Sequence, residues 1–240
     1  MYRPSLFQDI LDLLMPRPCA NCGRRLTAGE QTLCVGCMLQ LPRVQLEPTF
    51  EDNSLARLFW GCFPVGRATA FIYHQPQASS SRFIYRMKYE DQPIIARQMG
   101  ALMAKDLLTK GFFEGIDVLI PVPLSRKRQR QRGYNQSLEI ARGVAEVTAL
   151  PVCHHIVGRI HFKGSQTHLS AIDRRENVEG AFRLTPSHWW QRKETIEGRH
   201  VLLIDDVVTT GATLMACAQE LMKAKPRQIS ILALAYTRSQ

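Results

Sequence analysis

The fold is decided by one stretch near the carboxyl end of the chain, VLLIDDVVTTGAT at residues 201–213. Its first four residues are apolar and predict a buried strand, and Asp205 and Asp206 stand at the carboxyl end of that strand. A short loop then leads into a helix that we expect to begin near Ala212. Open parallel sheets bind ligands at this end of their strands, so the stretch predicts an α/β domain with a binding site.

The loop in this stretch carries groups that suit a monophosphate. Free backbone amides at the start of a helix attract anions, and Gly211 lets a ligand approach closely. Thr209, Thr210 and Thr213 add hydroxyl donors. The two carboxylates do not suit the phosphate itself, but they suit the vicinal hydroxyls of a ribose or a Mg2+ ion. The alternative is a capped turn with solvent-facing acids; the coincidence of donors and acids favours a ligand.

Strand and helix patterns alternate through the chain from Ala68 onward. We expect strands near residues 68–73, 116–122, 152–158, 180–184, 200–205 and 229–236, and helices near 79–89, 92–110, 135–149 and 211–225. This alternation predicts a parallel sheet covered on both faces. We assign residues 1–45 to an N-terminal module with a helix over 5–14, residues 46–66 to a linker containing Pro and Gly, and residues 67–240 to the main domain.

Two C-x2-C pairs mark the N-terminal module: Cys19 with Cys22, and Cys34 with Cys37. Each pair can turn both thiolates toward one point, and two facing turns give a tetrahedral shell of four sulfurs. Thiolates suit Zn2+, and four ligands close the shell, so the spacing predicts a structural zinc and not a catalytic one. A segment shorter than about 40 residues needs such a metal to fold. The alternative is two ordinary reduced cysteine pairs.

The composition is typical of a soluble globular protein, because 45% of the 240 residues are hydrophobic and 22% are charged. Disordered and fibrous classes are excluded. No window approaches the roughly 18 uninterrupted apolar residues of a membrane span. Asp9 and Asp12 interrupt the N-terminal apolar stretch, which is therefore not typical of a secretory signal. We expect a cytoplasmic, reducing location, in which disulfides are disfavoured.

The formal net charge is +10, and the excess is unevenly placed. Residues 1–120 hold 13 basic and 11 acidic side chains, whereas residues 121–240 hold 18 and 10. The densest basic run contains Arg126, Lys127, Arg128, Arg130 and Arg132. Such an excess favours phosphate-bearing partners, whether nucleotides, pyrophosphate or nucleic acid. A solvated basic loop that keeps the protein in solution is the alternative.

These features together resemble one family. Residues 201–213 resemble the motif with which type I phosphoribosyltransferases bind phosphoribosyl pyrophosphate (PRPP). The whole chain, from the four cysteines to the last strand, resembles the ComF/GntX family (competence protein F). Further matching stretches are PVPL at 121–124, RGYNQ at 132–136, QTHLS at 166–170 and RREN at 174–177. The resemblance implies an α/β fold with a type I phosphoribosyltransferase-like parallel sheet flanked by helices, and a small N-terminal zinc-ribbon-like module.

The resemblance also implies roles for individual residues. Asp205 and Asp206 would hold the 2- and 3-hydroxyls of the ribose. The 5-phosphate would lie against Thr209, Thr210, Gly211, Ala212 and Thr213. Fold analogy alone places Tyr73, Lys88 and Tyr89 in a hood over an acceptor.

Two basic segments match the parts of such a site that handle pyrophosphate. Leu124, Ser125, Arg126 and Lys127 match the pyrophosphate loop, with Mg2+ as a bridge. A DNA-phosphate patch or a solvated turn are the alternatives for this loop. Residues 163–177 lie where these enzymes carry a lid, and Arg174 or Arg175 would clamp the leaving pyrophosphate there. The alternative for these two arginines is a salt-bridged surface position.

The implied function is binding of PRPP or a ribose phosphate, with a role in the uptake or utilisation of external DNA. One interpretation is a phosphoribosyltransferase that acts by electrostatic stabilisation of the departing pyrophosphate, although no residue stands out as a base for an acceptor. The other is a non-catalytic adaptor or scaffold that keeps the fold as a sensor of PRPP or a nucleotide. Such an adaptor would bind single- or double-stranded DNA or a DNA-handling protein. The basic excess and the missing acceptor signature favour the adaptor.

Overall fold

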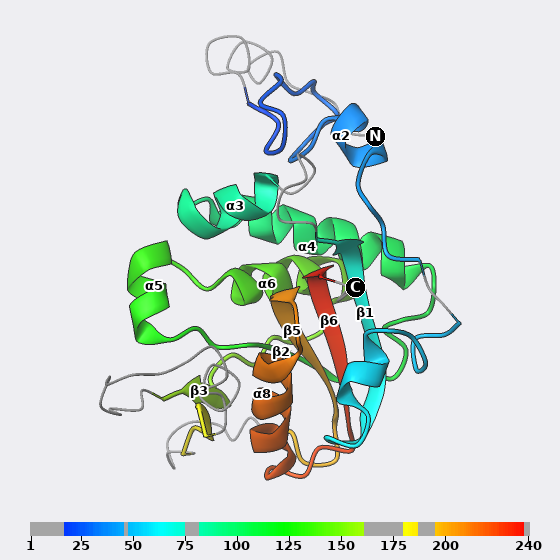
Figure 1. Cartoon of the computed structure of the whole chain (residues 1–240), viewed down its shortest axis with the longest axis vertical. Helices are drawn as coiled ribbons and strands as arrows, with labels where there is room; N and C mark the ends of the chain where they lie inside the picture. The colour runs from blue at the N-terminus through cyan, green and yellow to red at the C-terminus, as the bar shows by residue number, and fades with distance from the viewer. Residues whose placement is uncertain (1–16, 46–47, 75–81, 161–179, 187–194, 238–240) are drawn as a thin grey trace.

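A four-stranded parallel sheet forms the centre of the computed structural model (Figure 1). The structure describes residues 17–45, 48–74, 82–160, 180–186 and 195–237, so the helix expected over 5–14 lies outside the described residues. Across the sheet the order is β1 (Val65–Tyr73), β6 (Gln228–Tyr236), β5 (His200–Val208) and β2 (Val118–Pro121). The strands expected near 68–73, 116–122, 200–205 and 229–236 are confirmed, and all neighbouring pairs are parallel.

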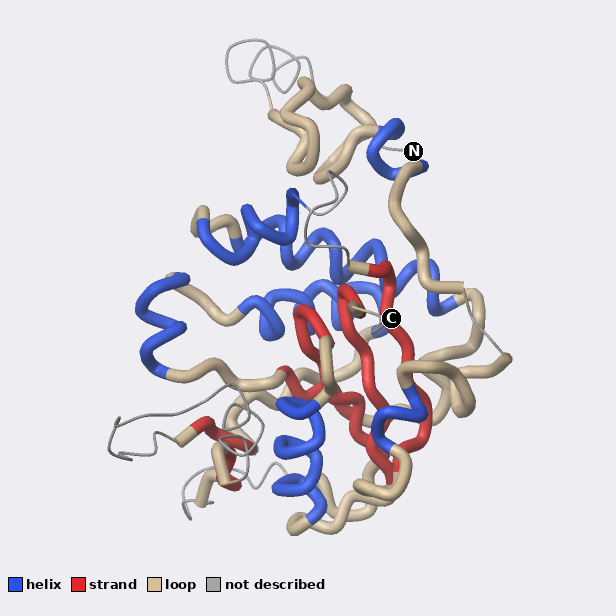
Figure 2. The backbone as a smooth tube through the Cα atoms, in the orientation of Figure 1, coloured by secondary structure: helices blue, strands red, loops and turns tan. Residues whose placement is uncertain are grey.

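Helices cover both faces of this sheet (Figure 2). The main ones are α3 (Arg82–Tyr89), α4 (Pro93–Leu108), α6 (Gln136–Thr148) and α8 (Ala212–Met222), and they confirm the four helices expected from the sequence. A short 3-10 helix, η1 (Ala56–Phe59), precedes β1. Among the described residues, none of the helices combines the length and the apolar character needed to cross a membrane.

Alternate residues of the central strands supply the two layers of the core. Leu202 and Ile204 of β5 belong to the cluster that packs under α3, α4 and α6. Val201 and Leu203 belong to the cluster on the opposite face, with η1 and α8. Because both faces are covered, the strand is a continuous apolar run and not an alternation of apolar and polar residues.

Helices α4 and α6 pack closely because each contributes a glycine to the contact. A Cβ atom at Gly143 would overlap the carbonyl oxygen of Arg97, and one at Gly100 would overlap that of Ile140. Only a residue without a side chain allows the two backbones to approach this far. This close contact fixes α6, which carries Ser137, against α4.

The strand expectations at 152–158 and 180–184 are correct only in part. Val152 forms an isolated parallel bridge with Leu119 beside β2, and the chain then leaves the main sheet. A separate two-stranded antiparallel sheet pairs β3 (Val157–Arg159) with β4 (Phe182–Leu184). Short β-branched runs predict strands, but they do not specify the strand with which each one pairs. That pairing depends on the path of the chain between the strands.

Two helices are absent from the sequence expectations, α2 (Val35–Leu39) and α5 (Arg126–Arg132). Helix α5 has five cations and buries no residue, so no apolar period marks it. It begins after Ser125, whose hydroxyl accepts a hydrogen bond from the Arg128 N–H at 3.3 Å. Arg126 and Lys127, expected in a loop, therefore lie in the first turn of a helix.

The segment between the cysteines and β1 is part of the packed structure. Leu55, Phe59 and Phe63, within the expected linker, are buried against the sheet. The side-chain amide of Asn53 donates to the Ala68 carbonyl oxygen at 2.9 Å and so joins this segment to β1. The Pro and Gly content that predicts a linker reflects irregular backbone here, not solvent exposure.

Candidate functional site

Asp205 and Asp206 lie inside β5, which continues to Val208 and is longer than the sequence pattern predicts. Strand β2 ends opposite Ile204, at Pro121, whereas β6 pairs with β5 as far as Val208. The two aspartates therefore have no strand neighbour on the β2 side. Side chains from helices reach them there instead.

Asp205 is a buried carboxyl held by two donors. Its Oδ1 accepts hydrogen bonds from the Ser137 hydroxyl at 3.0 Å and from the Asp206 N–H at 2.9 Å. Burial, and next the negative charge of Asp206, raise the pKa of Asp205 to about 7, against the opposing effects of these hydrogen bonds and of Lys88. Near neutral pH this carboxyl is divided between its protonated and ionised forms.

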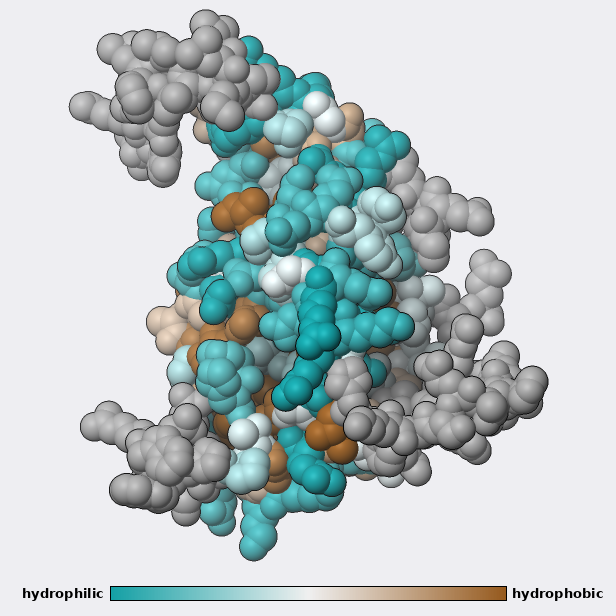
Figure 3. All heavy atoms as spheres, turned by 90° about the vertical axis from the view of Figure 1, so that its left-hand side faces the viewer, coloured by the Kyte–Doolittle hydropathy of each residue, from teal (hydrophilic) through white to brown (hydrophobic). Residues whose placement is uncertain are grey.

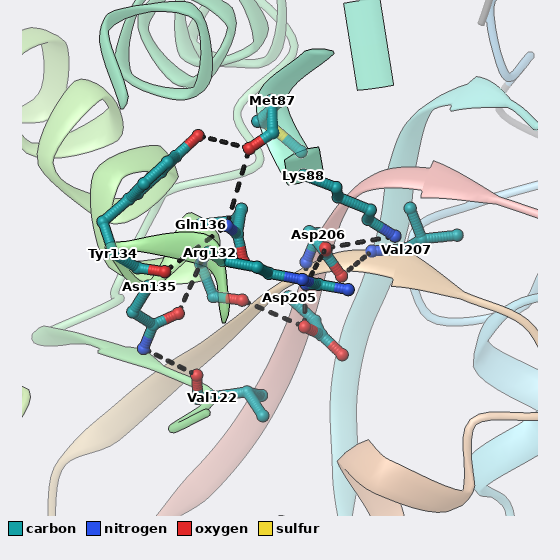
Figure 4. Close-up of polar contacts among 11 residues, drawn as sticks. Met87, Lys88, Val122, Arg132, Tyr134, Asn135, Gln136, Asp205, Asp206 and Val207 are labelled. Carbon is teal, nitrogen blue, oxygen red and sulfur yellow. Dashed lines mark hydrogen bonds and ion pairs between the residues drawn. The ribbon is translucent and has the colours of Figure 1, made fainter. Parts of the chain in front are cut away.

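Asp206 faces two cations (Figure 4). Its Oδ2 lies 3.2 Å from Nζ of Lys88 on α3 and 3.7 Å from Nη1 of Arg132 at the end of α5. The exposed fractions of the side chains are 14% for Asp206, 18% for Lys88 and 13% for Arg132, so water screens these pairs less than surface pairs. Two cations beside one ionised carboxylate leave a net positive charge, which suits an anionic ligand.

The stretch RGYNQ at 132–136 positions both cations (Figure 4). The Tyr134 hydroxyl and the Gln136 amide both donate to the carbonyl oxygen of Met87, at 2.5 and 3.5 Å. This pair of contacts fixes the end of α3 and so places Lys88. Gln136 also orients Arg132, because its Oε1 accepts a hydrogen bond from Arg132 Nη1 at 3.0 Å.

Two more residues of this stretch shape the backbone. Asn135 caps α6, because its Oδ1 accepts from the Ser137 N–H at 3.1 Å, and its Nδ2 donates to the Val122 carbonyl at 3.1 Å. Gly133 has φ of +75°, and a Cβ there would lie 2.6 Å from a carboxylate oxygen of Asp91. A side chain at this position would therefore strain the turn that carries Arg132 into the site.

The loop between β5 and α8 forms the second part of the site. A hollow is lined by Asp205, Val207, Val208, Thr209, Thr210, Gly211, Ala212, Thr213 and Leu214. Gly211 stands at the N-cap of α8 with φ of +77°, and the ring of Phe59 would contact any Cβ there at 3.1 Å. Gly211 offers no side-chain cap and the first turn has no acid, so this helix start suits an anion. The Ala212 N–H has a long contact of 3.5 Å with the Thr210 hydroxyl oxygen, which an anion could replace. Six of the seven predicted ribose-phosphate residues thus line one hollow, whereas Asp206, the next residue of β5, does not line it and faces Lys88 and Arg132.

The other predicted residues lie apart from the two aspartates or outside the described chain. Leu124 and Ser125 are half-buried, whereas Arg126 and Lys127 are exposed. Within the described residues, no hydrogen bond or ion pair joins any of these four to Asp205 or Asp206. Arg174 and Arg175 lie outside the described residues.

Sequence reasoning missed Ser137, His74 and Arg159 as neighbours of the aspartates. It named Lys88 only by analogy, and Arg132 only as part of the basic run and of the RGYNQ stretch. Ser137 follows a recognisable N-cap at Asn135, so its position at the start of a helix could have been predicted from the sequence. His74 directly follows the strand expected near 68–73, and this position at the carboxyl end of a parallel strand is a signal that could have identified it. Arg159 lies in the separate sheet of β3 and β4, and no local pattern places it near Asp205. Burial, and next Lys88, lower the pKa of His74, while Asp206 raises it. Burial likewise lowers the pKa of Arg159, which interacts with Asp205.

The four cysteines form a separate cluster. Their sulfur atoms all lie within 4.8 Å of one another, and those of Cys22 and Cys34 are 3.7 Å apart. Zn–S bonds of about 2.3 Å place sulfurs roughly 3.8 Å apart in a tetrahedron, so the donor set and its spacing fit a metal ion. Burial opposes ionisation of Cys19, but backbone N–H donors such as that of Cys34 lower its pKa to about 6. Burial raises the pKa of Cys37 to about 12.

Glu30 holds this cluster together, although the sequence gives no sign of its role. The carboxylate is buried and accepts from the N–H groups of Thr27, at 2.8 Å, and Val35, at 2.7 Å. Arg24 pairs with it at 3.2 Å. These backbone hydrogen bonds lower the pKa of Glu30, most of all those from Thr27 and Val35. One side chain thereby ties the turn after the first cysteine pair to the helix that carries Cys37.

Comparison with known proteins identifies the family. A model of the phosphoribosyl transferase domain matches residues 135–240. Competence protein F of Haemophilus influenzae is 30% identical over 225 residues, which are 90% of this chain and 96% of that protein. The chain belongs to the ComF family. The DNA utilization protein YhgH of Escherichia coli K12 is 27% identical and covers 91% of this chain and 90% of its own length.

The family confirms the predicted phosphoribosyltransferase-like fold of this ComF protein. Among solved structures, glutamine PRPP amidotransferase from Bacillus subtilis matches with a TM-score of 0.40 at 18% identity, covering 62% of this chain and 30% of that chain. The matched domain contains Asp205, Asp206 and the α8 loop. Lys88, Arg132 and the cysteine cluster precede it in the sequence.

The hydrogen bond from Ser137 to Asp205 predicts a pH-dependent loss of stability in the Ser137→Ala variant. Because folding raises the Asp205 pKa above its ordinary value, the wild type loses part of its stability as pH rises from about 4 toward 7. Above pH 7 the hydroxyl donates to a charged acceptor, so Ser137→Ala should cost about 1.5–3 kcal/mol there and less at pH 5. Urea unfolding at pH 5 and pH 8 measures this difference. An equal loss at both pH values would contradict it.

Proposed function

We propose that this ComF-family protein binds PRPP or a ribose phosphate between β5 and α8 and acts in the uptake or utilisation of external DNA. One observation carries the first part: the carboxyl of Asp205 lines one hollow together with residues 209–213, at a helix start that has neither a side-chain cap at Gly211 nor an acid in its first turn. Hydroxyls of a ribose would reach Asp205 and Asp206, and its 5-phosphate would reach the amides and hydroxyls of 209–213. The names of its relatives support the second part.

The two cations near Asp206 give the site its selectivity for PRPP over a neutral sugar. Ribose hydroxyls that hydrogen-bond to Asp206 compete with its ion pairs, so Lys88 and Arg132 become available to the pyrophosphate group. The two cations would complement the exposed Arg126 and Lys127 of the expected pyrophosphate loop. The described residues hold only one group of three or more metal-ligating side chains, the cysteines, so Mg2+ would arrive with the pyrophosphate oxygens. When bound, Mg2+ would neutralise part of their charge.

In the transferase interpretation, catalysis is electrostatic. The cations Lys88 and Arg132 stabilise negative charge on the departing pyrophosphate, and the carboxyls hold the ribose in place while its anomeric carbon gains positive character. The adaptor interpretation uses the same ribose-phosphate contacts for sensing only.

We also propose that the four-cysteine cluster holds one structural Zn2+. Three of the cysteines are buried and all four sulfurs converge, which closes the shell to a substrate. The metal would join the turn at residues 19–22 to the start of α2. Glu30 adds hydrogen bonds from the N–H groups of Thr27 and of Val35 at the start of α2.

The zinc proposal predicts about one zinc per chain in the purified protein. Cys22→Ser should remove most of the metal and lower the melting temperature, because the cluster packs against α3 and α4. Cys62→Ser is the matched control, since Cys62 is also exposed but lies outside the cluster. Elemental analysis with thermal unfolding measures both. Full zinc content in a variant lacking all four cysteines would exclude this site.

The ribose proposal predicts that Asp206→Asn weakens the binding of one ligand and leaves that of another intact. Binding of ribose 5-phosphate should weaken about tenfold or more, because a charged acceptor is removed. Binding of inorganic pyrophosphate should not weaken. Without the negative charge at position 206, Lys88 and Arg132 remain available to the anion. Thr210→Ala should weaken ribose 5-phosphate less, since the backbone amides remain.

Calorimetry of the full chain, with and without Mg2+, provides these measurements. Asp106→Asn is the control, because that exposed aspartate pairs with Lys110 on the surface. Loss of both ligands in Asp206→Asn, or no binding of PRPP by the wild type at millimolar concentration, would contradict a ribose-phosphate site.

Incubation with PRPP, Mg2+ and a panel of nucleobases distinguishes the two interpretations. Pyrophosphate release that depends on one base would identify a transferase and its acceptor. Tight PRPP binding without release for any base would identify the sensor or adaptor. If the wild type releases pyrophosphate, the Asp206→Asn protein should release less at the same PRPP concentration.

A further inference from the structure

Two exposed tyrosines lie side by side on the outer face of α3, with their rings tilted by 41° to each other. Tyr85 and Tyr89 are one helical turn apart, and their ring centroids are separated by 4.8 Å. Their exposed fractions are 59% and 62%, among the highest for large hydrophobic residues in the described chain. The inner face of the same helix buries Phe83, Ile84 and Met87. The tyrosines are therefore not needed for the core, which the other face of α3 already fills.

Helix α5 places a row of cations beside this pair. Arg126, Lys127, Arg128 and Arg130 are exposed, and none of them has an ion pair with a carboxylate among the described residues. The guanidinium of Arg132 lies 5.7 Å from the centre of the Tyr89 ring. Figure 3 views the molecule from the side on which α3 and α5 lie, and hydrophilic side chains dominate that face.

Aromatic faces bordered by unpaired cations match the chemistry of a single-stranded nucleic acid. Unpaired bases stack on exposed rings, and the backbone phosphates bind the neighbouring cations. A duplex would contact the cations but could not place its stacked bases on the rings. An acidic peptide would likewise use the cations and leave the tyrosines without a role.

We propose that Tyr85, Tyr89 and helix α5 form a binding platform for single-stranded nucleic acid. The proposal rests on the proposed role in DNA utilisation and adds the surface and the form of the nucleic acid. Arg132 contacts the Tyr89 ring and also Asp206, so the platform borders the ribose-phosphate site.

The test uses the full chain and a fluorescent oligo-dT of roughly 20 nucleotides, long enough for any common single-strand site. The Tyr85→Ala/Tyr89→Ala double variant should weaken binding at least about fivefold, and the Tyr85→Phe/Tyr89→Phe variant should retain binding because phenyl rings still stack. Trp60→Ala is the matched control. Trp60 is 51% exposed with Arg57 beside its ring, but it follows η1 at the opposite face of the sheet.

Salt dependence tests the contribution of α5. Replacing Arg126, Lys127, Arg128 and Arg130 with Gln should reduce the slope of log affinity against log salt by about 0.7 for each phosphate that the variant no longer neutralises. A duplex of equal length would contact the same cations, so the four substitutions should weaken its binding as well, whereas Tyr85→Ala/Tyr89→Ala should change its affinity little. Fluorescence anisotropy at several salt concentrations provides both measurements.

The outcomes separate this proposal from the ribose-phosphate site. Weak oligo-dT binding by the double alanine variant, with unchanged calorimetric affinity for ribose 5-phosphate, supports the platform. Equal affinity of wild type and double alanine variant for oligo-dT overturns it, as does a preference for duplex DNA. If the wild type binds ribose 5-phosphate but no oligo-dT, the platform fails and the ribose-phosphate site stands.

Discussion

Two adjacent carboxyls inside a central strand, those of Asp205 and Asp206, require polar or charged partners from the surrounding elements. A charge removed from water is costly unless it is neutralised, hydrogen-bonded or paired. The molecule uses each of these at once: the pKa of Asp205 is raised and Ser137 donates to it, while Lys88 and Arg132 pair with Asp206. These partners come from α6, α3 and α5. The packing of three separate helices is therefore tied to the chemistry of one strand.

Helix α3 connects the two functional parts of the molecule. At one point Arg86 donates to the Cys19 carbonyl at 3.5 Å, and two residues later Lys88 pairs with Asp206. Thr32 of the cysteine module also donates to Gln98 of α4 at 2.5 Å. A metal bound by the cysteines would thus stabilise the support on which α3 rests, although the cluster lies outside the ribose-phosphate site. This arrangement gives a structural reason for joining the two parts in one chain.

The sequence predicted the sheet and the ribose-phosphate residues because both depend on local patterns. Continuous apolar runs mark buried parallel strands, and residues 201–213 contain strand, acids, loop and helix start in one piece. The partners of the acids depend on tertiary structure. Lys88 reaches Asp206 only because Tyr134 and Gln136 hold the Met87 carbonyl, and no spacing in the sequence encodes that contact. Helix α5 was missed for another reason, since its stability does not come from an apolar face.

Helix α5 gains little stability from packing, because none of its residues is buried. Helix α5 has seven residues, buries none of them, and places like charges four residues apart at Arg126 and Arg130 and at Arg128 and Arg132. Such a short segment gains little from helix formation alone, so its amide protons should exchange with solvent through local opening at low free energy. A bound polyanion would remove the repulsion between these side chains. Binding of the polyanion would then stabilise α5, so that ordering of this helix and binding of the ligand are coupled.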